Sequence, residues 1–327
     1  MEMKMKPISG PRLSRRRMLE LGAAGLALAT PAVRALAAAQ PQGFFARHGL
    51  PIGLQLYTVG DSARTDLTGT LQKVAAAGFT AVELAGFHGH DAHALRQAAD
   101  AAGISYPSIH MQAKAQGTEP GLDQDPDRIA ADMRVLGVTE VVLPMFLLPE
   151  HLPKPEPGDR NFFSKAVAAL TRADWQATAA FLNRKAAQLQ KVGLRLSYHN
   201  HNPEFRPFDG TTGLEILLAE TDPALVSFEM DVGWVAAAGV DPVPLLKRQP
   251  HRFRMMHVKD IKASTQTNYA FQQDPTEVGR GKLDWPMLLD VAWASGVRHF
   301  FVEQEPPFER DRFEAIAISA KYLSTVA

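Results

Sequence analysis

The feature that most constrains the fold is a regular alternation of short apolar segments with longer amphipathic ones. Eight of the short segments have the length and the side-chain content of buried β-strands. They span residues 52–57, 80–84, 105–110, 140–144, 194–199, 225–230, 253–258 and 298–303. Helical patterns follow them at 67–77, 90–102, 126–136, 175–192, 212–219, 243–248, 285–294 and 311–324. Strands that alternate with helices in this way predict βα units and a parallel sheet.

Glycine lies within two residues of the end of five predicted helices, at Gly78, Gly103, Gly137, Gly193 and Gly296. Glycine is the favoured residue just after a helix, so each of these positions marks a helix end before the next strand. Eight βα units in about 285 residues match the size of a closed (β/α)₈ TIM barrel. We therefore expect a single-domain α/β TIM barrel. A doubly wound open sheet is the alternative, but no G-x-G-x-x-G motif follows the first predicted strand.

The first forty residues have a different character from the rest of the chain. Arginines at 15–17 precede an apolar run at 21–33 and an alanine-rich stretch at 35–39. A basic segment, a short apolar segment and a small-residue cleavage site are typical of an export signal. The consecutive arginines resemble the twin-arginine type. We expect a signal peptide at 1–39, a barrel domain at 40–327, and a periplasmic or otherwise exported protein without a stable membrane span.

Composition excludes several classes of function. The chain of 327 residues has no cysteine, which excludes disulfides, zinc–thiolate sites and cysteine nucleophiles. Its 35 basic and 35 acidic residues give a formal net charge of zero, which argues against a nucleic-acid partner. Two polar inserts, 145–171 and 262–282, follow predicted strands. We expect them to form loops on the substrate side of the barrel.

Ionisable side chains stand at the carboxyl ends of the predicted strands, where barrel enzymes place their catalytic groups. They are Glu83, His110, His199, His201, Glu204, Glu229, Asp231, His257, Lys259, Asp260, Glu303 and Glu305. Residues two apart on a strand share a face, so several of these groups converge on the barrel mouth. Buried carboxylates and imidazoles that converge are costly without a cation. Nitrogen and oxygen donors suit Mn²⁺, Zn²⁺, Co²⁺ or Fe²⁺, and Ca²⁺ less.

Structural roles compete with this interpretation for each residue taken alone. A single histidine or aspartate near a strand end is more often a surface or hydrogen-bonded group than a ligand. Glu83 and His110 are open to both a substrate-binding and a structural interpretation. His88, His90 and His93 lie in a loop and helix pattern, so we expect them on the solvated surface.

Six motifs carry a family resemblance. They are GFTAVEL at 78–84, YHNH at 198–201, FEMDVGW at 228–234, HVKD at 257–260, VGRG at 278–281 and FVEQ at 301–304. From about residue 53 onward the chain resembles the xylose-isomerase-like barrel superfamily, in its sugar phosphate isomerase/epimerase branch. The resemblance implies Mn²⁺, Co²⁺, Zn²⁺ or Mg²⁺ held by a Glu, an Asp, a His and a second Glu. Asp231, His257 and Glu303 match the last three, and His199 replaces the first glutamate.

The same resemblance implies a reaction. It predicts a metal-dependent isomerase or epimerase that acts on a non-phosphorylated keto-sugar through an enediolate, with Glu303 as acid/base and His199 or His201 as its partner. His201 and Glu204 are rival candidates for the first metal ligand. Further substrate contacts are expected from Glu83, His110, Lys259, Trp234 and Glu204. The alternatives are β-elimination from a 3-keto-glycoside, phosphodiester cleavage, and a non-catalytic carbohydrate-binding barrel. The expected partner is a small carbohydrate, and the oligomeric state stays open, a homodimer included.

Overall fold

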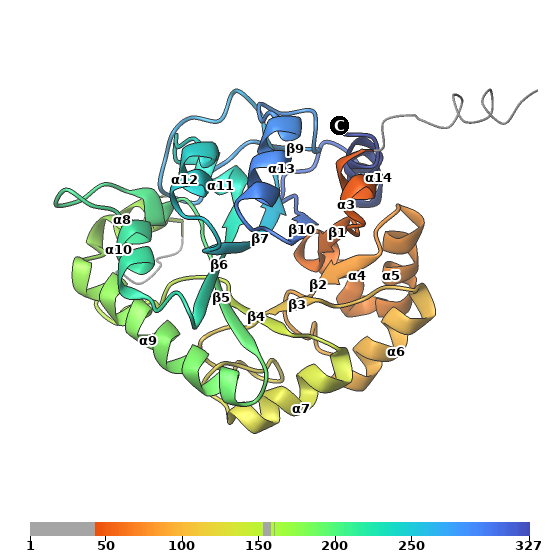
Figure 1. Ribbon diagram of the computed structural model, residues 1–327, viewed down its shortest axis with the longest axis horizontal. Coiled ribbons are helices and arrows are strands. Elements are labelled where there is room, and N and C mark those ends of the chain that lie inside the picture. Colours follow the sequence, from red (N-terminus) through yellow and green to blue (C-terminus); the bar gives the residue numbers. More distant parts are fainter. Residues whose placement is uncertain (1–42, 153–157, 160) are drawn as a thin grey trace, which may run out of the picture. The chain divides into compact units, whose positions relative to one another are not determined.

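The computed structural model describes residues 43–327 except 153–157 and 160. The predicted signal at 1–39 lies outside these residues and stays a prediction. A parallel sheet of eight strands forms the centre, in the spatial order β2-β1-β10-β7-β6-β5-β4-β3 (Figure 1). Its strands are β1 (Gly53–Gln55), β2 (Ala81–Glu83), β3 (Ser108–His110), β4 (Glu140–Leu143), β5 (Arg195–His199), β6 (Val226–Asp231), β7 (Phe253–Val258) and β10 (His299–Val302).

The sheet closes on itself between its first and last strands. Parallel bridges join Ala81 to Ser105 and Leu84 to Ile109, which brings β2 beside β3. The predicted (β/α)₈ TIM barrel is therefore confirmed, and the open doubly wound sheet is excluded.

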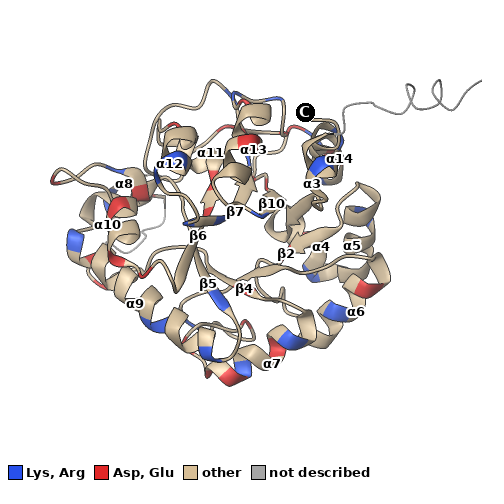
Figure 2. Ribbon diagram, in the orientation of Figure 1, with Lys and Arg blue, Asp and Glu red and all other residues tan. Residues whose placement is uncertain are grey.

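The helices predicted from the sequence all form, and they surround the strands (Figure 1). They are α5 (Leu67–Ala76), α6 (Ala92–Ala102), α7 (Pro126–Leu136), α9 (Arg172–Lys191), α10 (Gly213–Glu220), α12 (Pro242–Arg248), α13 (Trp285–Ala294) and α14 (Arg312–Leu323). Helix α9 begins three residues before the prediction because Thr171 and Asp174 form a capping box. Both signs of charge lie along the outer faces of α6 and α7 (Figure 2).

The loops after the strands carry additional short elements. These are α3 (Phe44–His48), the 3₁₀ turns η1 (Leu56–Val59) and η2 (Pro203–Phe205), α4 (Gly60–Thr65), α8 (Phe162–Ala169), α11 (Val232–Ala237) and the antiparallel pair β8 (Asp260–Ile261) and β9 (Pro275–Thr276). Helix α8 lies in the first predicted insert, and β9 lies in the second. No helix in the described part of the chain is long and apolar enough to cross a membrane.

Side chains fill the barrel interior below its carboxyl end. Val142, Met255 and Phe301 form a small apolar cluster of buried residues. Gly53 leaves room for this cluster, because a Cβ atom there would stand 2.5 Å from the Phe301 ring. At the amino end, buried Glu140 accepts a hydrogen bond from Arg195 at 3.0 Å. The interior is therefore a packed core, and chemistry is confined to the opposite mouth.

Candidate active site

A pocket of about 680 Å³ opens at the carboxyl end of the barrel. Its lining includes His110, His199, His201, Trp234, Glu303 and Glu305. A second cavity of about 520 Å³ is bordered by Arg195, Val226 and Arg254, at the amino ends of the strands. Barrel enzymes build their sites at the carboxyl end, so the first pocket is the candidate site.

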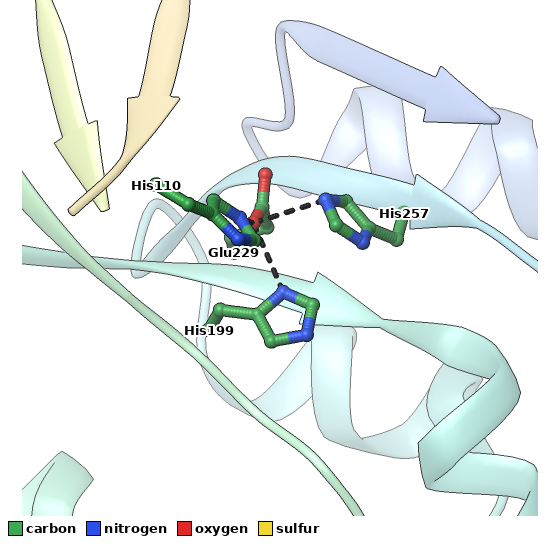
Figure 3. Close-up of side chains that lie close together, drawn as sticks. All are labelled: His110, His199, Glu229 and His257. Carbon is green, nitrogen blue, oxygen red and sulfur yellow. Dashed lines mark hydrogen bonds and ion pairs between the residues drawn. The ribbon is translucent and has the colours of Figure 1, made fainter. Parts of the chain in front are cut away.

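Three imidazole rings surround one carboxylate oxygen beneath this pocket (Figure 3). Glu229 Oε2 lies 2.9 Å from His110 Nε2, 3.0 Å from His199 Nδ1 and 3.1 Å from His257 Nε2. Glu229 and His257 are fully buried, and His199 is nearly so. We call His110, His199, Glu229 and His257 the inner group. It offers four donor atoms that lie within 4.8 Å of one another.

Glu83 borders the inner group from β2. Its Oε1 lies 2.8 Å from His257 Nε2 and 3.1 Å from His110 Nε2. The same oxygen accepts a hydrogen bond from Gln55 Nε2 at 2.8 Å. Gln55 and Glu83 are paired across β1 and β2, so the sheet register itself orients this carboxylate.

A second set of donors lies on the other side of the His257 ring. Nδ1 of His257 is 2.9 Å from Glu303 Oε2 and 3.7 Å from Asp231 Oδ2. We call Asp231, His257 and Glu303 the outer group, whose donor atoms also lie within 4.8 Å of one another. The fully buried Lys259 ammonium stands 2.7 Å from the same oxygens of Asp231 and Glu303, and 2.7 Å from Glu305 Oε1.

Strand register brings the two groups together. His199 on β5 is paired with Glu229 on β6, and Asp231 on β6 is paired with His257 on β7. Glu229 and Asp231 are two residues apart and therefore share a face. Asp231 also begins α11, where its Oδ1 accepts a hydrogen bond from the Trp234 backbone N–H.

Burial and charge oppose each other in the inner group. Burial lowers the pKa of His110, but Glu83 and Glu229 outweigh it and raise that pKa to about 9. Burial and the Glu83 charge raise the pKa of Glu229, yet the surrounding imidazoles bring it down to about 2. Burial and the nearby His257 hold the pKa of His199 well below 6.5.

The outer group balances its charges around Lys259. Burial lowers the pKa of the Lys259 ammonium, but the three carboxylates outweigh it and hold that pKa well above 10.5. Burial raises the pKa of Glu303, but Lys259 and His257 keep it well below 4.5. Burial raises the pKa of Glu305. Two neighbouring carboxyl groups in different environments are suited to different roles in proton transfer.

The remaining sequence-predicted residues take three different places. His201 lines the pocket, with its ring 5.6 Å from that of Trp234, and burial lowers its pKa to about 3. Trp234 lies under the Lys259 ammonium, 5.0 Å from it. Glu204 lies outside both donor groups and accepts a hydrogen bond from the Tyr198 hydroxyl at 2.6 Å. Burial raises the pKa of this carboxyl to about 7.

The structure also assigns positions in the site to residues for which the sequence predicted no role. Glu229 is at the centre of the inner group, and Glu305 contacts Lys259 beside the outer group; both were expected at strand ends but had no predicted role. Gln55 had no such indication, because only the pairing of β1 with β2 gives it a role. The expectation that His88 lies on the solvated surface is wrong. Its backbone has φ 53°, its side chain is only 6% exposed, and it lines the pocket.

Both donor groups fit a divalent metal ion. Each offers imidazole nitrogens and carboxylate oxygens, the donors that borderline divalent cations prefer. Glu83 Oε2 and Glu229 Oε1 are buried without a hydrogen-bond partner among the described residues. Such buried oxygens call for a further ligand or ion. The cluster is therefore compatible with a metal site.

Comparison with known proteins agrees with this geometry. The family model described as xylose isomerase-like TIM barrel matches residues 71–325, which is most of the chain. The chain belongs to this family. A solved structure from Parabacteroides distasonis ATCC 8503, described as a sugar phosphate isomerase/epimerase, shares the fold of this xylose isomerase-like barrel. It is 25% identical, covers 84% of this chain and 93% of its own, and superposes with a TM-score of 0.61.

Two curated relatives of this xylose isomerase-like barrel are named inosose dehydratases. The protein from Geobacillus kaustophilus (strain HTA426) is 33% identical over 98 residues, which are 30% of this chain and 31% of its own. Inosose dehydratase 2 from Bacillus cereus is 29% identical over 156 residues, which are 42% and 52% of the two chains. The matches thus span between a third and about half of these relatives' length.

Proposed function

We propose that this protein is a divalent-metal-dependent lyase that acts on a non-phosphorylated keto-sugar or a related cyclic keto-polyol. It removes the proton beside the carbonyl group and then expels an oxygen substituent from the next carbon. Three things support the proposal: a pocket with carboxylates at its floor, donor groups that fit a metal ion, and the dehydratase names of the two relatives.

The observation that carries the choice of a lyase is the residue at the end of β5. His199 stands where the ketose epimerases that this chain resembles have one of two facing glutamates. Its Nδ1 lies 3.0 Å from Glu229. Epimerisation requires a base on each face of the carbon. Four carboxylates line the pocket. Asp61 is paired with Arg312, and Glu119 accepts a hydrogen bond from the Gly89 backbone. This leaves Glu303 and Glu305, and both follow β10. An acid and a base on one side suit β-elimination.

The carboxylates divide the work as follows. Glu303 takes the proton from the carbon next to the carbonyl, and the electron pair of that C–H bond forms the enediolate. The bond from the next carbon to its oxygen then breaks, and Glu305 gives that oxygen a proton. The products are an unsaturated ketone and water, or an alcohol where the substrate is a glycoside. Lys259, 2.7 Å from both carboxylates, holds them in place.

A divalent cation bound here would polarise the carbonyl of the substrate and make its neighbouring C–H more acidic. The residues that would hold it are those of the inner or the outer group. Phe271 borders the pocket, is partly exposed and can present an apolar face to a sugar ring.

An isomerase or epimerase is the second candidate. The observation in its favour is the solved structure described as a sugar phosphate isomerase/epimerase, which covers most of both chains. Isomerisation shares the first proton transfer with elimination, but it returns the proton to the neighbouring carbon.

The predicted export signal bears on the substrate. We propose that the protein works in the periplasm or beyond, where phosphorylated sugars are scarce. A non-phosphorylated substrate fits this location.

The test is proton exchange in deuterated water. Protein loaded with Mn²⁺ is incubated with a panel of keto-sugars, 3-keto-glycosides and inososes, and the products are followed by NMR and mass spectrometry. A lyase releases the proton beside the carbonyl to solvent and loses water or an alcohol, whereas an isomerase returns a solvent deuteron to the neighbouring carbon and keeps the substrate's composition. Binding of a sugar without elimination or exchange would support the non-catalytic barrel. The proposal fails if no compound in the panel loses water or an alcohol.

A further inference from the structure

The inner and outer donor groups share the His257 ring, and the structure shows which of them has room for a divalent cation. We propose that the metal ion binds to the inner group, through His110 Nε2, His199 Nδ1, Glu229 Oε2 and His257 Nε2. The Lys259 ammonium permanently fills the outer group. The role of this metal ion in catalysis rests on the proposed function, whereas its binding site does not, because metal binding is measured without turnover.

The outer group already contains a cation. Lys259 Nζ lies 2.7 Å from Asp231 Oδ2 and from Glu303 Oε2, which are two of the three donor atoms of this group. A metal ion bound to those oxygens would stand next to a fully buried ammonium, and two cations in a region of low dielectric constant repel strongly.

The lysine has little freedom to leave. Its stem packs against Gly233, where an added Cβ would come within 2.7 Å of Lys259 Cγ. Its ammonium lies over the Trp234 ring and 2.7 Å from Glu305. If the Lys259 ammonium moved away, Glu305 and Asp231 would lose their counter-ion, and breaking a buried ion pair is strongly destabilising. The lysine is therefore a fixed part of the outer group.

The inner group has the opposite character. Its donors are three imidazole nitrogens and one carboxylate oxygen, and no lysine or arginine is within ion-pair distance of Glu83 or Glu229 in the described part of the chain. The two glutamates carry a formal charge of minus two, which one divalent cation would balance in place of the proton that they favour on His110. Each also has an oxygen without a partner among the described residues. His110 and His199 line the pocket, so a cation here is reachable by substrate.

The His257 ring is oriented for this assignment. Its Nε2 faces the inner group, 3.1 Å from Glu229, and its Nδ1 lies 2.9 Å from Glu303. Histidines that bind metals regularly donate their second ring N–H to a carboxylate, which fixes the ring. Glu303 thus serves as the orienting carboxylate of a ligand, and it remains free of the metal to act as a base.

The donor set also narrows the metal. Three imidazoles and one carboxylate favour Zn²⁺, Co²⁺, Fe²⁺ or Mn²⁺ over Mg²⁺, which prefers oxygen ligands. This choice of metals is narrower than the resemblance implied, because a ligand set of Glu, Asp, His and Glu offers one imidazole and the inner group offers three.

The experiment measures metal binding and ligand type in the full-length protein. Apo protein is titrated with Co²⁺, the affinity is measured by calorimetry, and the ligands are counted by X-ray absorption. We expect one ion with three imidazoles. The His110→Gln and Glu229→Gln variants should bind Co²⁺ at least about 10- to 100-fold more weakly. Loss of a group that only supports a ligand already costs this much affinity, and these variants remove a ligand itself. The Asp231→Asn variant should bind with close to wild-type affinity and keep the three-imidazole spectrum.

Folding is controlled by circular dichroism. Glu229 is fully buried, so its variant risks misfolding, whereas His110 lies at the pocket surface and keeps the test decisive. A spectrum with at most two imidazoles, or Co²⁺ binding that Asp231→Asn abolishes and His110→Gln preserves, overturns the inference. A three-imidazole site in a protein that eliminates neither water nor an alcohol from any keto-sugar would leave the metal site intact and refute the proposed function alone.

Discussion

Nδ1 of His257 lies 2.9 Å from Oε2 of Glu303, so one carboxylate contacts both the candidate metal ligand His257 and the pocket. Glu303 can therefore accept a substrate proton while it orients the histidine. The Glu303→Gln variant keeps the shape of the side chain and removes the base. We expect the proton-exchange rate to fall by about 10²- to 10⁴-fold, the usual contribution of general base catalysis.

This loss should occur without loss of metal. At saturating Co²⁺ the metal content of the Glu303→Gln preparation should equal that of the wild-type protein, although its Co²⁺ affinity should fall by about 10- to 100-fold because Glu303 orients His257. Glu314→Gln is the matched control, because Glu314 lies on α14 with a side chain 60% exposed. An exchange rate equal to that of this control would remove Glu303 from the mechanism.

The rim of the pocket carries an aromatic side chain that most proteins would bury. Phe163 on α8 lines the pocket, is 53% exposed and has its ring 5.3 Å from that of Phe271. A ring on the substrate can stack there, so Phe163→Ala should raise KM by about 2- to 10-fold for glycosides with an aromatic or second sugar ring. The value of kcat, and KM for free keto-sugars, should not change.

Steady-state kinetics on matched glycosides and free sugars test this prediction. Met287→Ala is the control, because Met287 is 50% exposed and lies on α13 outside the pocket lining. A Phe163→Ala variant that binds both substrate classes like the wild-type protein would show that the rim makes no contact with substrate.

Stability should fall in acid because of His88. Burial, partly offset by Glu119, lowers the pKa of its imidazole to about 4 from an ordinary value of 6.5. The unfolded chain therefore binds a proton at a higher pH than the folded one. The resulting loss in the free energy of unfolding is absent above about pH 6.5, grows as the pH falls, and reaches about 3 kcal/mol near pH 4.

The His88→Asn variant should lose this part of the acid dependence. Asparagine tolerates the left-handed backbone at this position better than most residues do. Urea unfolding of both proteins between pH 7.5 and 4.5 measures the difference, with the exposed His93→Asn as control. The other buried histidines titrate in both proteins and cancel in the comparison. Parallel curves for wild-type and His88→Asn protein would contradict the assignment.

The sequence predicted the architecture well because local chemistry specifies it. Apolar strands, capped helices and glycines after helices recur along the chain, and each acts within a few residues. The same holds for the strand ends, since strand alternation alone brings Glu229 and Asp231 to one face.

The arrangement inside the site was harder to predict, because it depends on contacts between distant strands. Glu204 follows the same strand as His199, yet it turns toward Tyr198 and away from the cluster. Lys259 was expected to contact substrate, but only the packed structure shows it fully buried among three carboxylates. His88 departed from its surface prediction because a single left-handed backbone angle turns it inward.

The HVKD motif ends on a residue whose role is structural. Asp260 Oδ2 accepts hydrogen bonds from the backbone of Gly279 at 3.0 Å and Gly281 at 3.1 Å, and from Trp285 Nε1 at 2.8 Å. Gly281 must be glycine here, since an added Cβ would collide with Asp260 Oδ1. One buried carboxylate thus holds the loop that leads from β9 to α13.

Asp260→Ala should therefore destabilise the protein without changing its chemistry. It leaves the N–H groups of Gly279, Gly281 and Trp285 without this acceptor, and at roughly 1–3 kcal/mol each the free energy of unfolding should fall by about 3–9 kcal/mol. Asp260→Asn retains one acceptor oxygen and should cost about half as much. Chemical denaturation measures both, with Asp274→Ala on the partly exposed segment before β9 as control. Equal stability of Asp260→Ala and this control would mean that the loop is held by other contacts, whereas unchanged Co²⁺ affinity in folded Asp260→Asn would place Asp260 outside the metal site.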